Sequence, residues 1–248
     1  MAAVEKRLPP IRIGCCGFVL AQARYFATFP CVEIDSSFYN LPKLETAARW
    51  RAAAPAGFQF SLKAWQVITH AADSPTYKQT RLDPGDRPHC GHFGFNPTTR
   101  WAWNETFQVA KTLGAFLVLF QCPVSFRPNK ENVDNLRRFF ERAKRGKLLM
   151  GWEPRGAWEP DLIARLCNEL ELVHVVDPLQ TPPAARAKIR YFRLHGTSIS
   201  GARTHFTDEQ LHRLRALCQA DSTPSYCLFN NSLMAGDAQR FARLIQQH

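Results

Sequence analysis

Eight short apolar segments, rich in residues that favour β-strands, follow one another along the chain, and helix-like stretches fill most of the gaps between them. The expected strands are residues 11–17, 31–36, 58–63, 116–122, 148–155, 172–177, 189–196 and 226–231. A strand and a helix repeated eight times is the pattern of an α/β protein folded as a (β/α)₈ TIM-type barrel. Such a barrel needs roughly 250 residues. The chain has 248, so we expect one domain over residues 1–248, with residues 1–10 as a loose lead-in.

The expected helices are residues 19–29, 44–54, 103–113, 132–144, 158–170, 207–220 and 235–246. Residues 179–188 contain two successive prolines, so they form a weak helix at best. Residues 71–101 are polar and rich in Pro, Gly, His and aromatic residues. We expect them to form a long loop after the third strand that lies over the C-terminal face of the barrel; a disordered insertion is the alternative.

Charged side chains stand near the ends of these strands, where the reactive groups of TIM-type barrels gather. Strand residues point alternately into and out of a barrel, so Glu33 and Asp35 share one face. Inward carboxylates are costly unless they are paired or bind a metal. The catalytic candidates, for acid/base or nucleophilic work, are Glu33, Glu153, His195 and Lys63. The candidates for holding or orienting a substrate are Arg155, Arg193, Gln121 and Asn230.

Two other interpretations of these strand-end residues stay open. They could form a self-neutralising network of ion pairs, such as Glu33 with Lys63 and Glu153 with Arg155. They could also bind a divalent metal through Glu33, Glu153, Asp177 and His195. Three neighbouring cations oppose a metal, so no metal or other cofactor is indicated. The ligand types in residues 89–92 (HCGH) are too close together to satisfy one ion alone.

The chain is basic, with 32 Lys and Arg against 21 Asp and Glu and a net charge of +11. This favours an anionic partner, either a small molecule or nucleic acid, although a solvated basic surface is the alternative. A small-residue loop at residues 197–201 (TSISG) could bind phosphate or be an ordinary turn. Tryptophans at positions 65, 101, 103, 152 and 158 could wall a pocket or pack at the barrel rim.

The eight cysteines are scattered without a CxxC motif, and several lie inside expected strands, which predicts free thiols and a cytoplasmic location. Ala21-Gln22-Ala23 looks like a signal-peptidase site, but Arg12 interrupts the preceding apolar run and cleavage would remove the first strand. No apolar stretch is long enough to span a membrane. The sequence gives no indication of an oligomeric state.

Seven stretches resemble the YecE-like family, in the family's order: IRIGCCGF, VEIDSSFYNLP, GFQFSLKAWQVITH, LGAFLVLFQCPVSF, GWEPRGAW, YFRLHG and FNNSLMAGDAQRF. The resemblance implies a TIM-type barrel but no established reaction. It places the family's recurrent polar positions on Glu33, Ser36, Tyr39, Lys63, His70, Gln121, Glu153, Arg155, Arg193, His195, Asn230 and Asn231. Ser36, Tyr39, His70 and Asn231 thereby join the binding candidates. The chain departs from the family at Cys15-Cys16-Gly17-Phe18, where a Thr-Ser-Gly-Trp-like turn is common, and at Asp35, where Asn is common.

Together these features predict an enzyme that uses acid/base chemistry on a polar anionic small molecule. Glu33 or Glu153 would be the base, and His195 the acid or an electrostatic stabiliser. The alternative is a protein that binds or processes nucleic acid, which would require basic residues gathered around the mouth of the barrel.

Overall fold

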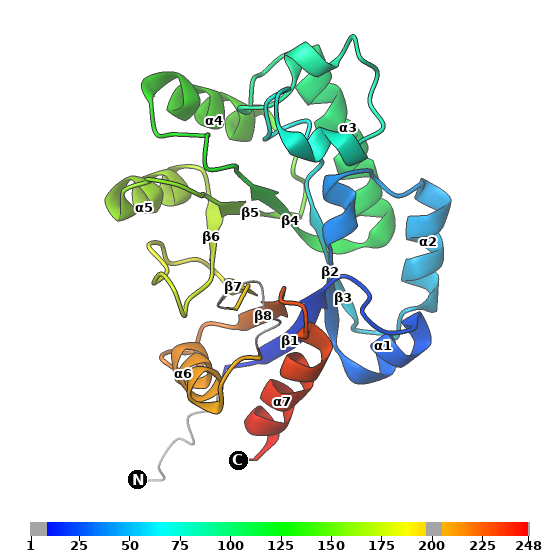
Figure 1. Ribbon diagram of the computed structural model, residues 1–248, viewed down its shortest axis with the longest axis vertical. Coiled ribbons are helices and arrows are strands. Elements are labelled where there is room, and N and C mark those ends of the chain that lie inside the picture. The colour runs from blue at the N-terminus through cyan, green and yellow to red at the C-terminus, as the bar shows by residue number, and fades with distance from the viewer. Residues whose placement is uncertain (1–8, 197–204, 248) are drawn as a thin grey trace.

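The computed structural model describes residues 9–196 and 205–247 and shows a closed barrel of eight parallel strands in sequential order (Figure 1). The strands are β1 (Ile11–Cys16), β2 (Cys31–Ile34), β3 (Gln59–Lys63), β4 (Ala115–Gln121), β5 (Leu149–Glu153), β6 (Leu172–Val176), β7 (Arg190–Leu194) and β8 (Ser225–Phe229). The α/β TIM-type barrel expected from the sequence is therefore confirmed.

Helices pack around the outside of the barrel (Figure 1). They are α1 (Gln22–Thr28), α2 (Leu44–Ala53), α3 (Pro97–Leu113), α4 (Lys130–Arg142), α5 (Pro160–Glu169), α6 (Asp208–Cys218) and α7 (Met234–Gln246), with short 3₁₀ turns η1 (Asp35–Phe38), η2 (Pro75–Gln79) and η3 (Arg87–His89). None of the helices in the described ranges is both long enough and apolar enough to cross a membrane.

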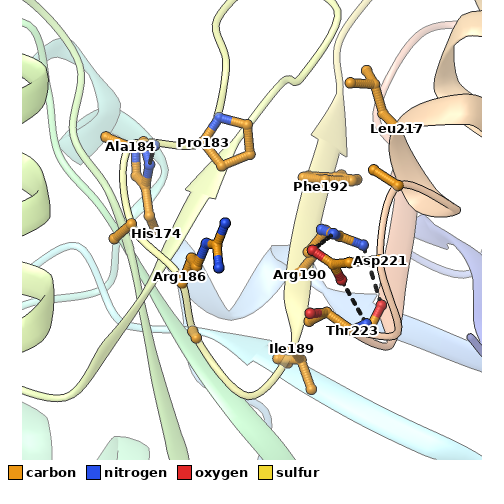
Figure 2. Close-up of a pocket in the computed structure, with 13 residues that line it drawn as sticks. His174, Pro183, Ala184, Arg186, Ile189, Arg190, Phe192, Leu217, Asp221 and Thr223 are labelled. Carbon is orange, nitrogen blue, oxygen red and sulfur yellow. Dashed lines mark hydrogen bonds and ion pairs between the residues drawn. The ribbon is translucent and has the colours of Figure 1, made fainter.

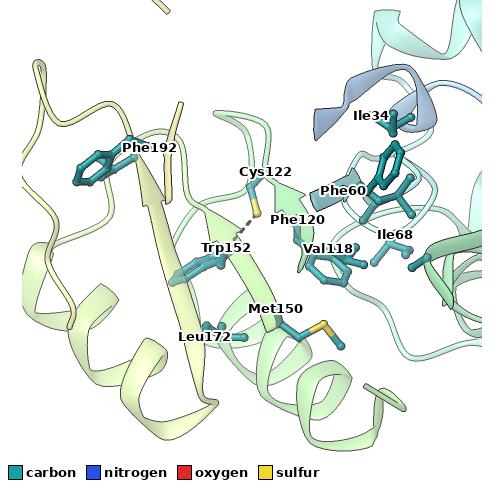
Figure 3. Packing of buried hydrophobic residues seen from close by; sticks show 14 of the residues in the cluster. Ile34, Phe60, Ile68, Val118, Phe120, Cys122, Met150, Trp152, Leu172 and Phe192 are labelled. Atoms are coloured by element: carbon teal, nitrogen blue, oxygen red, sulfur yellow. Dashed lines mark hydrogen bonds between the residues drawn. The ribbon is translucent and has the colours of Figure 1, made fainter. Parts of the chain in front are cut away.

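Two hydrophobic clusters divide the core along the two faces of the strands. One fills the inside of the barrel and includes Leu117, Leu119, Val173, Val175 and Leu228. The other, larger cluster lies between the barrel and its helices, where Phe120, Met150 and Trp152 pack together (Figure 3). Strand side chains alternate between the two faces, so most strands contribute to both clusters; β3 gives Phe60 and Leu62 to the outer cluster, while its other residues are polar.

The five tryptophans near the strand ends divide between packing and exposure. Trp65, Trp103, Trp152 and Trp158 are buried in the outer cluster. The Trp152 indole N–H donates to the sulfur of Cys122 at 3.2 Å (Figure 3). Trp101 is 42% exposed and lies edge-on to Trp65. Four of the five therefore pack in the layer between barrel and helices, as in the packing alternative, and Trp158 also lines a cavity at the ends of β5 and β6.

The long connection after β3 differs from the prediction at its C-terminal end. Helix α3 begins at Pro97, not at residue 103, because Asn96 and Thr99 form a capping box and proline is favoured at the first helical position. The remaining residues 71–96 contain η2 and η3. They are held against the segment that follows β3, since the amides of Gly91 and Phe93 donate to the carbonyls of Val67 and Ile68.

Residues 177–189, which connect β6 to β7, contain no helix, so even the weak helix considered for residues 179–188 is absent. Proline lacks the N–H that a helix interior needs, and two of them stand in this segment. Residues 1–8 of the expected lead-in and the loop at residues 197–201 lie outside the described residues.

Candidate functional site

A buried arginine organises the C-terminal end of the barrel interior. Arg193 on β7 has no exposed surface, and its guanidinium donates to carboxylates from three different elements. Nη2 lies 2.9 Å from both Glu33 and Asp35, while Nη1 lies 2.8 Å from Glu153. Nη1 also donates to the side-chain carbonyl of Gln121 at 3.1 Å. The guanidinium thus cross-links β2, η1, β4 and β5 to β7, and its donors are occupied by protein atoms.

Glu33 is fully buried and has a second set of partners below Arg193. The Tyr191 hydroxyl donates to Glu33 Oε2 at 2.8 Å, and the Ser61 hydroxyl lies 2.6 Å from the Tyr191 oxygen. The thiol of Cys16 also faces Glu33; burial and this neighbouring carboxylate raise the pKa of Cys16 well above its ordinary value. Both carboxylate oxygens of Glu33 therefore accept hydrogen bonds, and the side chain is held rigidly.

Asp35 and Lys63 form the next ion pair, at 3.3 Å. Strand β2 ends at Ile34, so Asp35 starts the 3₁₀ turn η1 instead of continuing the strand. The Lys63 ammonium also lies 4.0 Å above the ring of Phe38. Burial lowers the pKa of Lys63, and the attraction of Asp35 does not make up for it.

Glu153, Arg155, His195 and Asp177 form the more accessible side of the cluster. Arg155 Nη2 donates to Glu153 Oε1 at 2.7 Å and lies 3.0 Å from His195 Nε2. A guanidinium can only donate, so Nε2 of His195 accepts and its proton resides on Nδ1. Asp177 accepts from the backbone N–H of His195 at 3.0 Å. The side chains of Arg155 and His195 are 38% and 26% exposed, so ligands can reach them.

The charges of this cluster set the protonation states. Burial raises the pKa of Glu153, but Arg193 and Arg155 lower it by more, so the carboxylate is ionised at neutral pH. Burial lowers the pKa of His195, and Glu153 only partly opposes this, so the imidazole is neutral at pH 7. An ionised carboxylate therefore lies 3.9 Å from a neutral imidazole.

Two cavities open beside the cluster. The mouth cavity, of about 520 Å³, is lined by Glu153, Arg155, Trp158, Asp177 and His195. The β1–β2 cavity, of about 400 Å³, is lined by Gly17, Phe18, Ile34, Asp35, Tyr39 and Trp50. Both volumes lie in the range of small-molecule sites.

A third cavity, the outer cleft of about 340 Å³, lies on the outside of β7 beneath the helix-free connection from β6 (Figure 2). Of its charged residues, Arg190 and Asp221 bind each other at 2.5 Å, and Arg186 also lines the cleft. None of the site residues expected from the sequence lines this cleft. The outer cleft is present because no helix connects β6 to β7. The polar cluster lies at the mouth of the barrel, so the candidate site is there.

The sequence matches the model of a family described as "Protein of unknown function DUF72" over residues 21–248. The chain belongs to the DUF72 family. The resemblance to YecE-like proteins is thereby confirmed. No curated protein is similar enough in sequence to count as a relative.

Solved structures share the fold of this DUF72 chain. A DUF72 family protein from Enterococcus faecalis superposes with a TM-score of 0.71 at 20% identity, covering 97% of this chain and 99% of that one. A second, from Thermotoga maritima, gives 0.70 at 19% identity, with 96% and 100% covered. Endonuclease IV from Thermus thermophilus gives 0.56 at 11% identity, with 97% and 100% covered. At these identities the likeness establishes the fold alone.

The remaining expected site residues of the DUF72 chain lie around this cluster at different depths. His70 is buried with its ring 4.8 Å from that of Phe38, and burial lowers its pKa to about 3. Ser36 is exposed, and Tyr39 lines the β1–β2 cavity. Asn230 is half-buried, and its backbone N–H donates to the carbonyl of Leu194.

Asn231 takes part in a second group of polar side chains. Its amide donates to Asp237 at 2.7 Å. Asp237 is fully buried on α7 and also accepts from Arg240 at 2.8 Å, while His205 Nδ1 lies 2.9 Å away. The hydrogen bond to Asp237 thus joins Asn231 to residues of α7 and of the segment that precedes α6.

Sequence reasoning missed Tyr191, Ser61 and Asp237. An inward tyrosine two residues before Arg193 was available as a signal, because both lie on the same face of β7. Asp237 gave no such signal, since a single acidic residue near the start of a helix is ordinary on a protein surface.

The residues considered for a metal do not gather around a common point. Within residues 9–196 and 205–247, no group of three or more His, Cys, Asp or Glu side chains is arranged to hold a metal ion. Glu33 and Glu153 both bind Arg193, which occupies the space between them with positive charge. This donor set therefore fits a guanidinium better than a metal ion.

Proposed function

We propose that this protein is an enzyme that transfers a proton to or from a small polar molecule carrying an anionic group. The observation that supports this most is the ionised Glu153 beside the neutral His195 and the half-exposed Arg155, at the edge of a 520 Å³ cavity. Perturbed acid and base groups that converge on a cavity are the mark of acid/base catalysis. The position at the C-terminal ends of barrel strands agrees with it.

In the proposed site, Arg155 is the contact for the anion. The cluster as a whole holds four carboxylates (Glu33, Asp35, Glu153 and Asp177) against three cations (Lys63, Arg155 and Arg193). An anion must therefore be held locally by an accessible guanidinium, because the cluster has no general positive field. Arg193 is fully buried by its own partners, so it acts as a positioning residue.

His195 is the proposed base. Its Nε2 accepts a hydrogen bond from Arg155. An anionic group that draws Arg155 towards itself removes the shorter of two contacts at this lone pair, the other being Arg193 Nη1 at 3.4 Å, and so opens it to a proton from the substrate. The resulting imidazolium is stabilised by Glu153, whose Oε1 lies 3.9 Å from Nε2. The imidazolium then returns this proton to another atom of the substrate, which leaves the site as it began.

The test is a panel of phosphorylated and carboxylated metabolites incubated with the purified protein and followed by proton and phosphorus NMR. We expect at least one compound to be converted, and Glu153→Gln to abolish that conversion without changing the circular dichroism spectrum. The matched control is Glu45→Gln, which changes an exposed carboxylate on α2 and should keep full activity. Turnover by Glu153→Gln would remove the residue from the mechanism.

Nucleic-acid processing is the second candidate, supported by the net charge of +11 and by the fold shared with endonuclease IV. Against it, the described side chains of the cluster carry four carboxylates against three cations, whereas a phosphate backbone is bound by a groove lined with basic residues. Fluorescence anisotropy of labelled single- and double-stranded DNA decides between them. Affinity that falls by about 100-fold or more between low and physiological salt would support this candidate, and no measurable binding would exclude it.

We further propose that the protein works in the cytoplasm. All eight cysteines are free thiols, and all are buried. Reduced cysteines are the rule in that compartment, and fractionation of cells with an antibody to the protein tests the location.

A further inference from the structure

The β1–β2 cavity lies on the opposite side of the ion cluster from the mouth cavity, and the proposed acid/base step does not use it. Its walls are largely apolar. Phe18 and Trp50 are half-buried and meet edge-to-face at 5.7 Å between ring centres, and Tyr39 adds a third aromatic side chain. Ile34, 2% exposed, also lines the cavity.

The backbone also leaves room beside these rings. Gly17 has a φ of +113°, and no atom lies within 4 Å of the point where a side chain would begin. A glycine in this left-handed conformation turns the chain at the end of β1 without filling the cavity. The result is a space of about 400 Å³ that a flat ring can enter against aromatic faces.

One guanidinium connects the two cavities. Arg193 binds Asp35, which lines the β1–β2 cavity, through Nη2, and Glu153, which lines the mouth cavity, through Nη1. The two lining carboxylates are thus each one hydrogen bond away from the same side chain. A small molecule that occupies both cavities therefore has to span little more than the width of one guanidinium, over the side chains that cover the buried Arg193.

The charges of the β1–β2 cavity exclude an organic cation as its occupant. Asp35 is the acidic group in the lining, and it already binds both Lys63 and Arg193. An ammonium group entering there would meet these two cations without a free carboxylate. A neutral ring faces no such cost and gains from burial against Phe18 and Trp50.

We infer that the substrate is an anion carried on an aromatic or heteroaromatic ring, with the ring in the β1–β2 cavity and the anionic group on Arg155. This inference rests on the proposed function, because it takes the Arg155 contact from there. It adds the ring as the second part of the substrate.

The test uses isothermal titration calorimetry with inorganic phosphate, a series of phenylalkyl phosphates of increasing linker length, and benzyl alcohol as the ring without the anion. The best ester should bind about tenfold or more tighter than inorganic phosphate. Phe18→Ala, which removes one wall, and Ser36→Trp, which fills the cavity from an exposed position, should both abolish that gain. Trp101→Ala removes an aromatic side chain that does not line this cavity and should leave the gain intact.

The outcomes separate this inference from the proposed function. If every ester binds only as tightly as inorganic phosphate, or the gain survives in both Phe18→Ala and Ser36→Trp, the ring subsite is overturned while the anion contact stands. If no phosphate binds but benzyl alcohol does, and Phe18→Ala removes that binding, the ring subsite is supported and the anion contact is overturned. Phe18→Ala could unfold the protein, so Ser36→Trp provides the independent variant.

Discussion

Replacing Arg193 with methionine tests the central claim that one buried guanidinium holds the candidate site together. The change keeps most of the side-chain length and removes the charge. It leaves Glu33 and Glu153, which are 0% and 5% exposed, without their main cationic partner. Breaking a buried ion pair by removing one partner costs ~3–5 kcal/mol, because the other charge stays buried and uncompensated. For a protein of this size that lowers the melting temperature by about 10 °C.

The pH dependence of the stability lost in Arg193→Met identifies the cause of that loss. With Arg193 present, the pKa of Glu153 is lowered, so its contribution to stability is present at neutral pH and is lost as the pH falls through that lowered pKa. Without Arg193, burial acts with less opposition and raises the pKa of Glu153. At neutral pH the variant is then destabilised by the buried, ionised Glu153, and protonation of this carboxylate removes the destabilisation. The difference in stability between wild type and variant should therefore narrow from pH 7 to pH 5.

The assay is urea unfolding followed by tryptophan fluorescence at both pH values. Arg137→Met is the matched control, because Arg137 pairs with Glu169 on the surface, where a salt bridge contributes about 0–1 kcal/mol. A loss below ~1 kcal/mol for Arg193→Met would contradict the stabilising role of the guanidinium, and a difference that stays constant between pH 7 and pH 5 would contradict the contribution of Glu153.

Three further changes test single contacts. Because burial lowers the pKa of His174 to about 4, the unfolded chain gains a proton first as the pH falls, and stability is lost. His174→Gln keeps an acceptor for the Ala184 amide but does not titrate. Between pH 7 and pH 5 its free energy of unfolding, measured by urea titration, should therefore fall by ~2 kcal/mol less than that of the wild type. Equal falls for the two proteins would contradict this. Gly14→Ala places a methyl group against the backbone of the neighbouring strand β2 and should cost about 3 kcal/mol in thermal unfolding, whereas Gly85→Ala meets only the end of a flexible side chain and should change little. Asp237→Asn turns an oxygen that accepts from several donors into an amide, so we expect a loss of ~2–3 kcal/mol by the same measurement; an unchanged melting temperature would show that these hydrogen bonds contribute nothing net.

Much of the candidate site could be predicted because strand periodicity is local. A period of two puts Glu33 on the inner face of β2, and Arg193 on the inner face of β7. Burial of these side chains together with Lys63 and Glu153 agrees with that assignment. The end of each strand could be predicted only to within two residues, since polar residues follow apolar ones there but do not mark the last paired position.

The pairing of these side chains could only partly be predicted. The expected pair of Glu153 with Arg155 forms, because the two residues are neighbours on one strand end. The pair of Glu33 with Lys63, considered from the sequence, is replaced by Glu33 with Arg193 and Lys63 with Asp35. Which side chain faces another across the barrel depends on how the strands are staggered when the barrel closes.

The barrel, its strand order and the inner face of each strand can be inferred from the sequence, because they follow from alternation and from the repeated strand–helix unit. The enclosure of Arg193 by carboxylates, the accessibility of Arg155 and the hydrogen bond of Asn231 to Asp237 emerge only when the chain is folded. The same holds for the two cavities beside Arg193. The physical reason is that burial, ion pairing and empty space arise between residues far apart in the chain, and local sequence patterns carry no information about their separation.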